Sequence, residues 1–364
     1  MPTPVTAAVA YHPNQPFSLK TCQLDGPAPG EVLVTVEATG LCHTDIAARD
    51  QDMPLPLPAV LGHEGVGRIE ALGEGVTGFQ VGDRVLLGFG ACGQCGNCQD
   101  QAPGYCDVGA VFLLQGSRLD GSSPMTCDGE AITGHFFGQS SFATKTVAIA
   151  TNLVKVPEDM PAELLAPMAC GVQTGMGSVM LSMAAKPGKA IAVLGCGTVG
   201  LSAIIAAKII GCDPIIAVDR MPSRSELAKE LGATHCLSGD DLLQNLAQLG
   251  GLDYALDTTG VPAVAEAAID VLKPRGVMVC VGVGKPGARL NIDMGMLMAT
   301  GRQVRGAIEG DAVPADFVPK MIGFYKQGQL PLEKLVTTYP FEQINQAVDD
   351  AHSGAAVKPV LLMR

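Results

Sequence analysis

The stretch Ala190-Ile-Ala-Val-Leu-Gly-Cys-Gly-Thr-Val-Gly200 decides the fold of the middle of the chain. Its apolar start predicts a buried strand, and the residues that follow open a predicted helix over 199–210. Between strand and helix lies the pattern G-x-G-x-x-G, formed by Gly195, Gly197 and Gly200, with Thr198 and Val199 among them. Glycines there permit a tight turn and a close approach of the backbone to a pyrophosphate at the helix N-terminus. Taken alone, the pattern is weak evidence for a dinucleotide-binding site.

Strands and helices alternate after this turn. We expect further strands at 215–218, 254–257 and 277–281, and helices at 224–231 and 263–272. Alternation of this kind predicts right-handed crossovers around a parallel sheet with helices on both faces. The segment is therefore predicted to be a doubly wound α/β domain.

An acidic residue strengthens the dinucleotide interpretation. Asp219 ends the second predicted strand, 24 residues after Gly195, where a carboxylate binds both hydroxyls of a ribose. A carboxylate also repels a ribose 2′-phosphate, so the sequence favours NAD over NADP. Arg220 and Arg224 oppose this preference, since either side chain can contact a phosphate.

The whole chain has the composition of a well-buried globular protein that is long enough for two domains. Of its 364 residues, 47% are hydrophobic and 16% are charged. The net charge of −12 argues against a nucleic-acid partner, because such a partner needs a basic face. Residues 1–16 contain no signal-peptide pattern, and the apolar runs 164–185 and 190–207 are both interrupted by glycines. We therefore expect a cytoplasmic protein with no membrane segment.

The N-terminal part of the chain has a different pattern of predicted elements from the middle part. Short strands are predicted at 31–37, 65–70 and 84–87, with glycines at the turns between them. The rhythm of alternating strands and helices is lost again after about residue 308. We therefore expect a β-rich domain that is built from both ends of the chain.

A comb of cysteines lies inside this β-rich part. Its members are separated by two, two and seven residues: Cys92, Cys95, Cys98 and Cys106. Without a secretory signal, cysteines indicate metal ligands or free thiols more than disulfides. Paired C-x-x-C turns aim two thiolates at one ion, and four thiolates without a histidine make a closed, tetrahedral zinc site. An iron–sulfur cluster uses a similar comb, and unrelated buried thiols are a third reading. We favour a structural zinc.

A second group of candidate ligands has a different composition. Cys42 opens the run Cys42-His-Thr-Asp45, His63 lies in Gly62-His-Glu-Gly65, and Cys170 lies near the predicted domain junction. Two thiolates and an imidazole leave a fourth zinc position open, as catalysis requires. Each residue alone is more often a core cysteine or a hydrogen-bonded histidine. Together, beside a dinucleotide motif, they indicate a catalytic metal site.

These motifs carry a resemblance to a known family. The two ligand runs, the four-cysteine loop, Cys170-Gly-Val-Gln-Thr-Gly175 and the glycine pattern stand in the order of the zinc-containing medium-chain alcohol dehydrogenases, which the chain resembles over essentially its full length. Phe136-Phe-Gly-Gln-Ser-Ser-Phe-Ala143 and the Cys170 run look especially like the aryl or benzyl alcohol branch. That branch also contains enzymes for terpenoid allylic alcohols such as geraniol.

The resemblance implies a fold and a reaction. A GroES-like, β-rich catalytic domain is expected over 1–171 and 309–364, around a Rossmann NAD-binding domain over 172–308. Two zinc ions per subunit are expected, one structural and one catalytic. The catalytic zinc would polarise an alcohol oxygen, and hydride would pass from the alcohol carbon to NAD. Homodimers and homotetramers are both found on this scaffold, and the sequence does not choose between them.

The resemblance also assigns site residues. Cys42, His63 and Cys170 would be the ligands of the catalytic zinc, with Glu64 close behind the metal and Asp45 orienting His63. Further contacts to the cofactor are implied for His43, Thr174, Val199, Arg224, Val281, Val283 and Lys358, the last of these to the pyrophosphate. Thr174 and Val199 are equally well explained as ordinary packing, and His43 as a surface residue.

Proton transfer is expected to depend on Thr44. Its hydroxyl would carry the alcohol proton away, although a loop hydroxyl that closes a local turn is the alternative. Many family members have a histidine three residues later as the end of a proton relay, but here that residue is Ala47. The outer part of the relay is therefore expected to differ, with water and the cofactor ribose as a possible route.

The predicted substrate pocket is apolar. Its residues, assigned by matching position, are Met53, Phe89, Phe136, Phe137 and Met294. Aromatic rings and polarizable sulfur suit flat or unsaturated alcohols, so we expect a primary aromatic or allylic alcohol. Two or three of these residues are expected to be plain core.

Other functions explain fewer of these features. A glutathione-dependent formaldehyde dehydrogenase or a general aliphatic alcohol dehydrogenase would share the scaffold, but the sequence shows no anion-binding arginine for glutathione. A methyltransferase that binds S-adenosylmethionine would leave the open zinc site unexplained. A non-catalytic binding protein on the same fold would have no need for Thr44 and a complete ligand set.

Overall fold

The computed structural model describes residues 2–363 and divides the chain into two units. The first unit combines the residues up to Cys170 with those from Val313 onward, and the second is Gly171–Ala312. The second junction lies four residues beyond the expected end of the inserted domain at 308. The reason is the short turn η7 (Glu309–Asp311), whose Glu309 accepts hydrogen bonds from Gln173 and Thr174 of the second unit.

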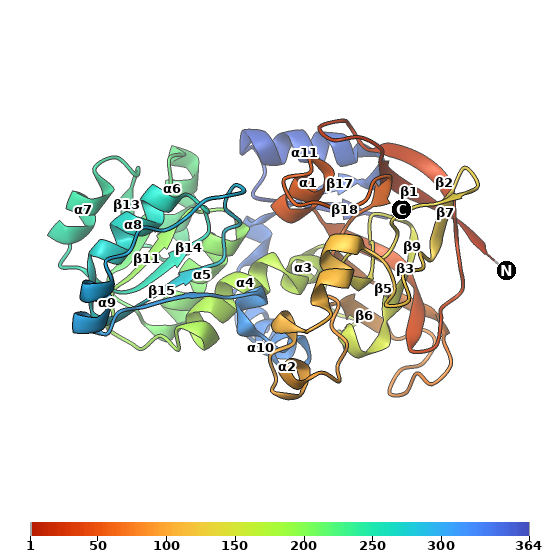
Figure 1. The fold of residues 1–364 in the computed structure, drawn as a ribbon, viewed down its shortest axis with the longest axis horizontal. Coiled ribbons are helices and arrows are strands. Elements are labelled where there is room, and N and C mark those ends of the chain that lie inside the picture. Colours follow the sequence, from red (N-terminus) through yellow and green to blue (C-terminus); the bar gives the residue numbers. More distant parts are fainter. Residues whose placement is uncertain (1, 364) are drawn as a thin grey trace. The chain divides into compact units, whose positions relative to one another are not determined.

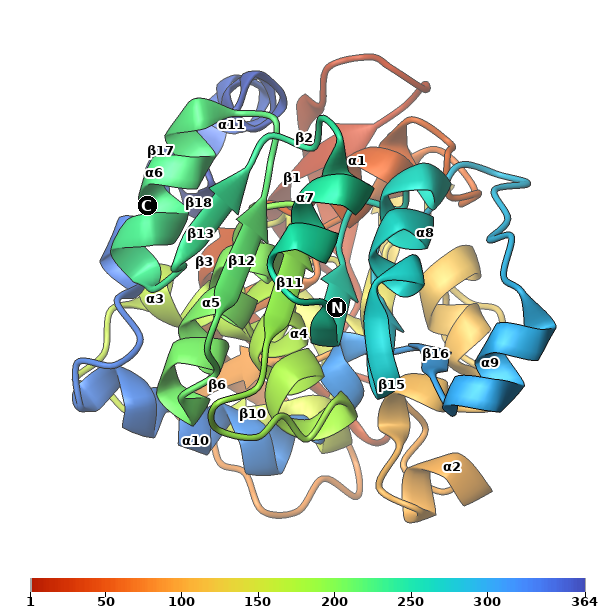
Figure 2. The same ribbon diagram turned by 90° about the vertical axis from the view of Figure 1, so that its left-hand side faces the viewer.

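The second unit is built on a six-stranded sheet in which all the strands are parallel. Their order is β13-β12-β11-β14-β15-β16, which is the 3-2-1-4-5-6 arrangement of a Rossmann fold. Figure 2 shows β11, β12 and β13 side by side. The strands are β11 (Ile191–Leu194), β12 (Ile215–Val218), β13 (His235–Leu237), β14 (Leu252–Asp257), β15 (Leu272–Cys280) and β16 (Gln303–Gly306).

Helices connect these strands, and several of them bury apolar side chains on the sheet. Helices α7 and α8 share a core with Ala192 and Leu194 of β11, whereas α5 contacts β11 and β12 and packs on α4. The helices are α4 (Gly171–Gly177), α5 (Thr198–Ile210), α6 (Pro222–Leu231), α7 (Leu242–Gln248), α8 (Pro262–Asp270) and α9 (Met294–Thr300). The predicted alternation is thus present, with element ends displaced by a few residues.

The first unit contains two sheets (Figure 1). One has the order β4-β1-β2-β7-β8, with β1 (Thr3–Ala10), β2 (Ser18–Leu24), β4 (Ala59–Val60), β7 (Met125–Cys127) and β8 (Glu130–Ala131). The other has the order β10-β6-β5-β3-β18-β17, and β9 also pairs with β3. Its strands are β3 (Glu31–Gly40), β5 (Glu64–Leu72), β6 (Arg84–Leu87), β9 (Lys145–Ile149), β10 (Leu153–Lys155), β17 (Val336–Pro340) and β18 (Lys358–Leu362).

The C-terminal strand completes the second of these sheets. Residues Val360–Leu362 of β18 pair antiparallel with Ala38–Gly40 of β3, so β18 lies beside the residues that lead into Cys42. The helices of this unit are α1 (His43–Arg49), α2 (Gly96–Gln99), α3 (Ala162–Leu165), α10 (Pro314–Lys326) and α11 (Ile344–Ser353). The N-terminal β-rich segment and the C-terminal segment therefore form one unit.

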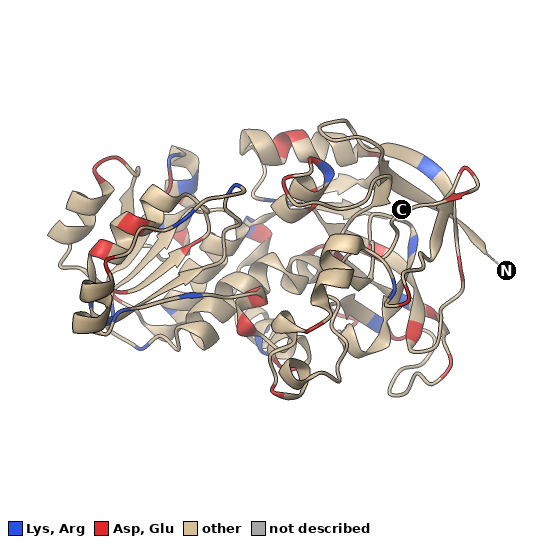
Figure 3. Ribbon diagram, viewed as in Figure 1, with Lys and Arg blue, Asp and Glu red and all other residues tan. Residues whose placement is uncertain are grey.

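Apolar helices and charge are distributed as follows. Among residues 2–363, no single helix is long and apolar enough to cross a membrane, and one bent pair, Ala162–Ala169 with Gly171–Ser182, passes by length and composition only. Acidic and basic residues are scattered over the elements of both units (Figure 3), and some form exposed pairs such as Lys326–Asp159. Exposed pairs of this kind contribute little to stability.

Candidate active site and metal centres

The run Cys42–Asp45 is fixed by the start of helix α1. Asp45 Oδ2 accepts a hydrogen bond from the backbone N–H of Cys42 at 2.9 Å, which is half of a capping box. Gly40 precedes this turn at the end of β3, and a Cβ there would lie 1.8 Å from Glu64 Oε2. Glycine is therefore required for Glu64 to reach its position beside Cys42.

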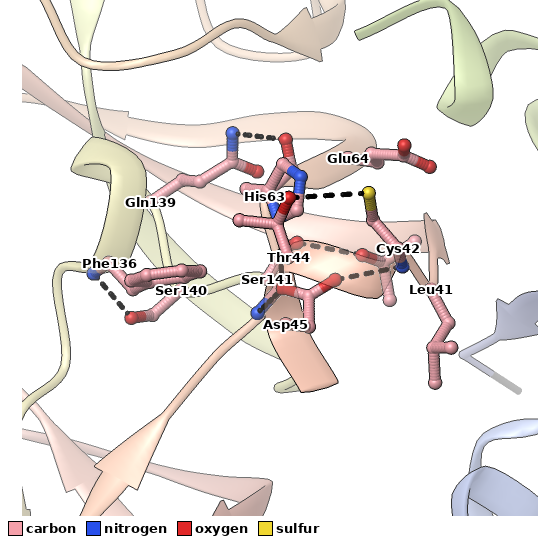
Figure 4. A network of polar contacts seen from close by, with 12 residues as sticks. Leu41, Cys42, Thr44, Asp45, His63, Glu64, Phe136, Gln139, Ser140 and Ser141 are labelled. Atoms are coloured by element: carbon pink, nitrogen blue, oxygen red, sulfur yellow. Dashed lines mark hydrogen bonds and ion pairs between the residues drawn. The ribbon is translucent and has the colours of Figure 1, made fainter. Parts of the chain in front are cut away.

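Only one of the two ring nitrogens of His63 is held by a hydrogen bond. Its Nδ1–H donates to Asp45 Oδ1 at 2.8 Å, and the same oxygen accepts the N–H of Gly62 at 3.0 Å (Figure 4). His63 is 1% exposed, and its Nε2 is buried without a hydrogen-bond partner. A buried imidazole nitrogen with a lone pair and no partner is unusual in a protein core, and it is suited to a metal ion.

Three further side chains complete the cluster around this nitrogen. The ligand atoms of Cys42, His63, Glu64 and Cys170 all lie within 4.8 Å of one another. Neighbouring Cys170 and, more weakly, the ammonium of Lys358 outweigh desolvation and hold the pKa of the Cys42 thiol well below its usual value. The thiolate is the form that binds metal. Two thiols and an imidazole nitrogen without a partner therefore fit a zinc ion with an open position.

Lys358 differs from its expected role. We expected contact with a pyrophosphate, but the side chain is 2% exposed, and its ammonium donates to both oxygens of Glu64 at 2.8 and 2.9 Å. A third bond, of 3.1 Å, goes to the carbonyl of Leu41. All three ammonium protons are thus used inside the first unit, because strand β18 delivers Lys358 to the buried carboxylate. Although burial lowers it, the pKa of Lys358 is raised above its usual value by Glu64.

The four cysteines of the comb also come together. The Sγ atoms of Cys92, Cys95, Cys98 and Cys106 lie within 4.8 Å of one another in the loop that contains α2. Backbone N–H groups point at the sulfurs: that of Cys95 lies 3.4 Å from Cys92 Sγ, and that of Cys92 lies 3.3 Å from Cys106 Sγ. Hydrogen bonds from the backbone, that of Gln94 first, lower the pKa of Cys92 to about 7. Four thiols without a histidine fit a closed tetrahedral metal site.

Two phenylalanines form an aromatic wall beside His63. The Phe137 ring stacks on the imidazole with centroids 4.5 Å apart, and the Phe136 ring meets it edge-on at 5.9 Å. Both belong to the short turn η3 (Phe136–Gly138), in which Phe137 has the left-handed φ of 54°. Such a backbone conformation is costly for a residue with a side chain and persists only where the surroundings impose it.

The other predicted pocket residues lie in different places. Phe89 is buried and lines a cavity of about 270 Å³ in the first unit, and Met53 packs on the same core as the two phenylalanines of the aromatic wall. Met294 belongs to the second unit, where it is 84% exposed on α9, a helix without buried residues. The assignment of Met294 to the pocket therefore stays a prediction.

The proton-transfer candidates lie along α1. Thr44 is half-buried, and its Oγ1 lies 3.7 Å from Cys42 Sγ. His43 is exposed, and Ala47 is buried on the same helix. Ala47, which stands where many family members have the relay histidine, is thus buried in the core of the first unit.

The glycine pattern of the second unit has the geometry that its sequence predicts. Gly195 has a φ of +90°, and a Cβ on Gly200 would lie 1.8 Å from the carbonyl of Gly195. Gly197 is exposed directly before α5, whose first residues are Thr198 and Val199. Only glycine allows the turn to close this tightly before the N-terminus of α5, which is the arrangement typical of a pyrophosphate site.

Asp219 follows β12, beside this turn. Its Oδ2 accepts from the N–H of Cys196 at 2.7 Å, and its Oδ1 accepts from the N–H of Met221 at 2.8 Å. Arg224 is buried on α6, and burial lowers the pKa of its guanidinium below the usual value. The carboxylate is thus held by backbone at the carboxyl end of the sheet, where dinucleotides bind in this type of fold.

The remaining cofactor candidates are spread over the second unit. The Thr174 hydroxyl donates to Glu309 at 3.2 Å, and Val283 is 70% exposed. Val281 donates its N–H to the carbonyl of Asp257 at 2.9 Å, so only its carbonyl is left for a carboxamide.

Gln139 and Glu309 were missed by sequence reasoning. Both are buried polar residues, and each contacts a residue of a predicted site: His63 for Gln139 and Thr174 for Glu309. A signal for Gln139 existed, since it interrupts the aromatic run Phe136–Ala143 with an amide.

Comparison with known proteins agrees with this geometry. Residues 28–158 match the alcohol dehydrogenase GroES-like domain, and residues 198–327 match the zinc-binding dehydrogenase family. The chain is 41% identical over 362 residues to geraniol dehydrogenase of Castellaniella defragrans, covering 98% of this chain and 97% of that protein.

Two solved structures have the same fold over their whole length. The benzyl alcohol dehydrogenase of Acinetobacter calcoaceticus is 40% identical with a TM-score of 0.95, and an alcohol dehydrogenase zinc-binding domain protein of Burkholderia ambifaria is 45% identical with a TM-score of 0.97. Each match covers 100% of both chains. The expected fold class is confirmed, and the chain belongs to the zinc-containing medium-chain alcohol dehydrogenases, in the branch that resembles benzyl alcohol and geraniol dehydrogenases.

Proposed function

We propose that the protein interconverts primary aromatic or allylic alcohols and their aldehydes, with NAD as the hydride carrier. The observation that carries the proposal is the buried, unpaired Nε2 of His63 between the thiols of Cys42 and Cys170, next to the ring of Phe137. The printed names of two relatives, geraniol dehydrogenase and benzyl alcohol dehydrogenase, support this substrate class.

The chain's own residues would prepare the site in a defined way. Cys42, His63 and Cys170 would hold one zinc ion, and the comb cysteines would hold a second. When bound, the first zinc supplies a Lewis acid that lowers the pKa of an alcohol oxygen. Asp45 holds the proton on Nδ1 of His63 and so keeps Nε2 available. Lys358 neutralises Glu64, so that the buried carboxylate adds no net charge beside two thiolates.

Proton removal is assigned to Thr44, a half-buried residue whose hydroxyl oxygen lies 3.7 Å from Cys42 Sγ. The aromatic wall packs on the His63 ring, and an aromatic surface of this kind would suit a flat substrate. The second unit would hold NAD, which would supply the acceptor for the hydride. Asp219 would select NAD by repelling a 2′-phosphate, although its two oxygens already accept backbone N–H groups.

Assembly and location are part of the same proposal. The exposed methionines of α9 are Met294, Met296 and Met298. This helix precedes the edge strand β16 in the chain, and an exposed apolar surface of this kind supports a homodimer or homotetramer. No disulfide joins any two cysteines within residues 2–363, which supports the cytoplasm as the location.

Two measurements test the proposal. Metal analysis of the purified chain should give two zinc ions and no iron, and Cys95→Ser should retain only one zinc while NAD still binds. With benzyl alcohol, the rate of NAD reduction should exceed the rate of NADP reduction. Asp219→Gly should lower the ratio of the NAD rate to the NADP rate. Iron at the comb, or an unchanged cofactor ratio in Asp219→Gly, would contradict the respective assignment.

A further inference from the structure

Gln139 is a fully buried amide whose side chain is saturated with hydrogen bonds. Its Oε1 accepts from the N–H of Gly65 at 3.1 Å. Its Nε2 donates to the carbonyls of His63, Leu87 and Gly88 at 3.0, 3.1 and 3.1 Å. Figure 4 shows the amide beside His63. Every partner is a backbone group, so the interaction depends on where the chain runs and not on a neighbouring side chain.

The Gln139 side-chain amide replaces backbone hydrogen bonds that β5 and β6 do not make with each other. Strands β5 and β6 pair antiparallel from Arg68–Arg84 to Val66–Leu86, and their pairing stops there. The next backbone groups, the N–H of Gly65 and the carbonyl of Leu87, are bound instead by the two ends of the Gln139 amide. A carboxamide offers one donor and one acceptor side by side, as a neighbouring strand does. Gln139 thus separates the two strands at the point where β5 begins.

The Gln139 amide lies directly beside the backbone of His63, the proposed zinc ligand. The carbonyl of His63 and the N–H of Gly65 flank Glu64, and the same amide binds both. A Cβ on Gly65 would lie 3.0 Å from Oε1 and 2.9 Å from the Cβ of Ser141, so the close approach requires glycine. The backbone position of His63 is therefore set by Gln139, while Asp45 sets the rotation of its ring.

The same residue closes the turn that carries the aromatic wall. The N–H of Gln139 donates to the carbonyl of Phe136 at 3.1 Å, and its carbonyl accepts from the hydroxyl of Thr146. Ser140 Oγ accepts from the N–H of Phe136 at 2.8 Å and donates to the carbonyl of Val60 at 2.6 Å. These bonds hold the left-handed Phe137 against the imidazole. Gln139 therefore binds the His63 backbone through its side chain, and through its own backbone it closes the turn that carries the phenylalanine stacked on the His63 ring.

We propose that Gln139 is a positioning residue that sets the spacing between the zinc-ligand histidine and the aromatic wall, and thereby the preference for flat alcohols. The inference rests on the proposed function for its substrate class. An apolar residue here leaves the N–H of Gly65 and three carbonyls buried without partners, so the strands must move to satisfy them. The movement shifts His63 relative to Phe137 without touching Thr44 or Asp219.

The test compares wild-type enzyme with Gln139→Met, which is similar in length and has no amide, and with Gln329→Met, an exposed glutamine, as the control. We expect Gln139→Met to lower the ratio of kcat/KM for benzyl alcohol to that for hexanol by about tenfold or more, because small displacements in an active site cost much rate. The visible spectrum of enzyme with cobalt at the Cys42–His63–Cys170 site should also shift. NAD affinity and the metal content of the comb should not change.

The alternative outcomes are distinct. A variant that loses stability but keeps the substrate ratio and the cobalt spectrum shows a merely structural role and overturns the proposal. If Gln139→Met does not fold, Gln139→Glu keeps the shape and one acceptor, and an unchanged cobalt spectrum and substrate ratio in that variant overturn it too. If the wild-type chain oxidises no alcohol, the proposed function fails, while the cobalt spectrum still decides whether Gln139 positions His63.

Discussion

The ammonium of Lys358 lies 2.8 and 2.9 Å from the two carboxylate oxygens of Glu64, and both side chains are buried. The two residues are 294 positions apart in the chain, so the pair ties the C-terminal strand β18 to the start of β5. A buried pair is strongly destabilised when one partner is removed, because the other charge stays behind without compensation.

The first prediction follows from this pair. Lys358→Met should lower the free energy of unfolding by about 3–5 kcal/mol. Urea denaturation measures the change, and Lys326→Met, which breaks the exposed pair with Asp159, should cost less than about 1 kcal/mol. The double variant Glu64→Gln/Lys358→Met should recover part of the loss. Unchanged stability of Lys358→Met, combined with weakened NAD binding, would restore the pyrophosphate role that we exclude.

Asp45 gives a prediction about zinc affinity. Asp45→Asn weakens the acceptor that holds the proton on His63 Nδ1 and that also binds the N–H of Gly62. We expect the affinity of the catalytic site for zinc to fall about 10–100-fold. Competition with a coloured chelator measures it, and the zinc of the cysteine comb in the same molecule is the control. Equal release from both sites would show a general loss of structure.

We expect substitutions of Thr44 to change kcat without changing zinc or NAD binding. Thr44→Ala removes the hydroxyl assigned to proton transfer, and we expect kcat to fall about 100-fold or more. Thr44→Ser keeps a hydroxyl and should retain most of the activity. Zinc content and NAD affinity should be unchanged in both variants. Near-normal turnover of Thr44→Ala would reduce Thr44 to a residue of the turn at the start of α1.

His135 predicts a pH dependence of stability. Burial lowers the pKa of its imidazole to about 4, whereas the unfolded chain has the usual value near 6.5. As pH falls, the unfolded state therefore takes up a proton before the folded state does, so stability falls from about pH 6.5 downward. Between pH 7.5 and 5 the loss from this residue should be about 2 kcal/mol.

The corresponding experiment removes the titrating group. His135→Leu should show a weaker loss of stability over that range than the wild type in denaturation at several pH values. His12→Leu, at an exposed histidine, is the matched control and should leave the profile unchanged. A wild-type profile that is flat between pH 7.5 and 5 would contradict the burial of a neutral imidazole.

Local patterns made much of the fold and of the metal centres predictable. The strand–helix alternation of the second unit repeats over many residues, and cysteine spacing encodes a ligand loop directly. Strands β4 and β8 escaped prediction because each has only two residues, too few for a period to be visible. The branch of the family was also readable, from the run Phe136–Ala143.

Partners distant in the chain could not be predicted. Nothing in the sequence near Lys358 indicates that it forms an ion pair with Glu64. A single lysine on a strand would be predicted to be exposed. Gln139 binds only backbone, so no pattern of side chains marks its targets. Met294 is assigned to the pocket by matching position alone, and its exposure on α9 depends on packing that a sequence position does not encode.

The central claim is that the site around His63 and Phe137 oxidises flat alcohols with NAD. Its most direct test is kcat/KM for benzyl alcohol, geraniol, hexanol and ethanol, each measured with NAD and with NADP. The account predicts that benzyl alcohol and geraniol with NAD exceed ethanol by about tenfold or more, since each well-placed contact is worth a factor of this size. Higher kcat/KM for ethanol or hexanol, or activity confined to NADP, would contradict it.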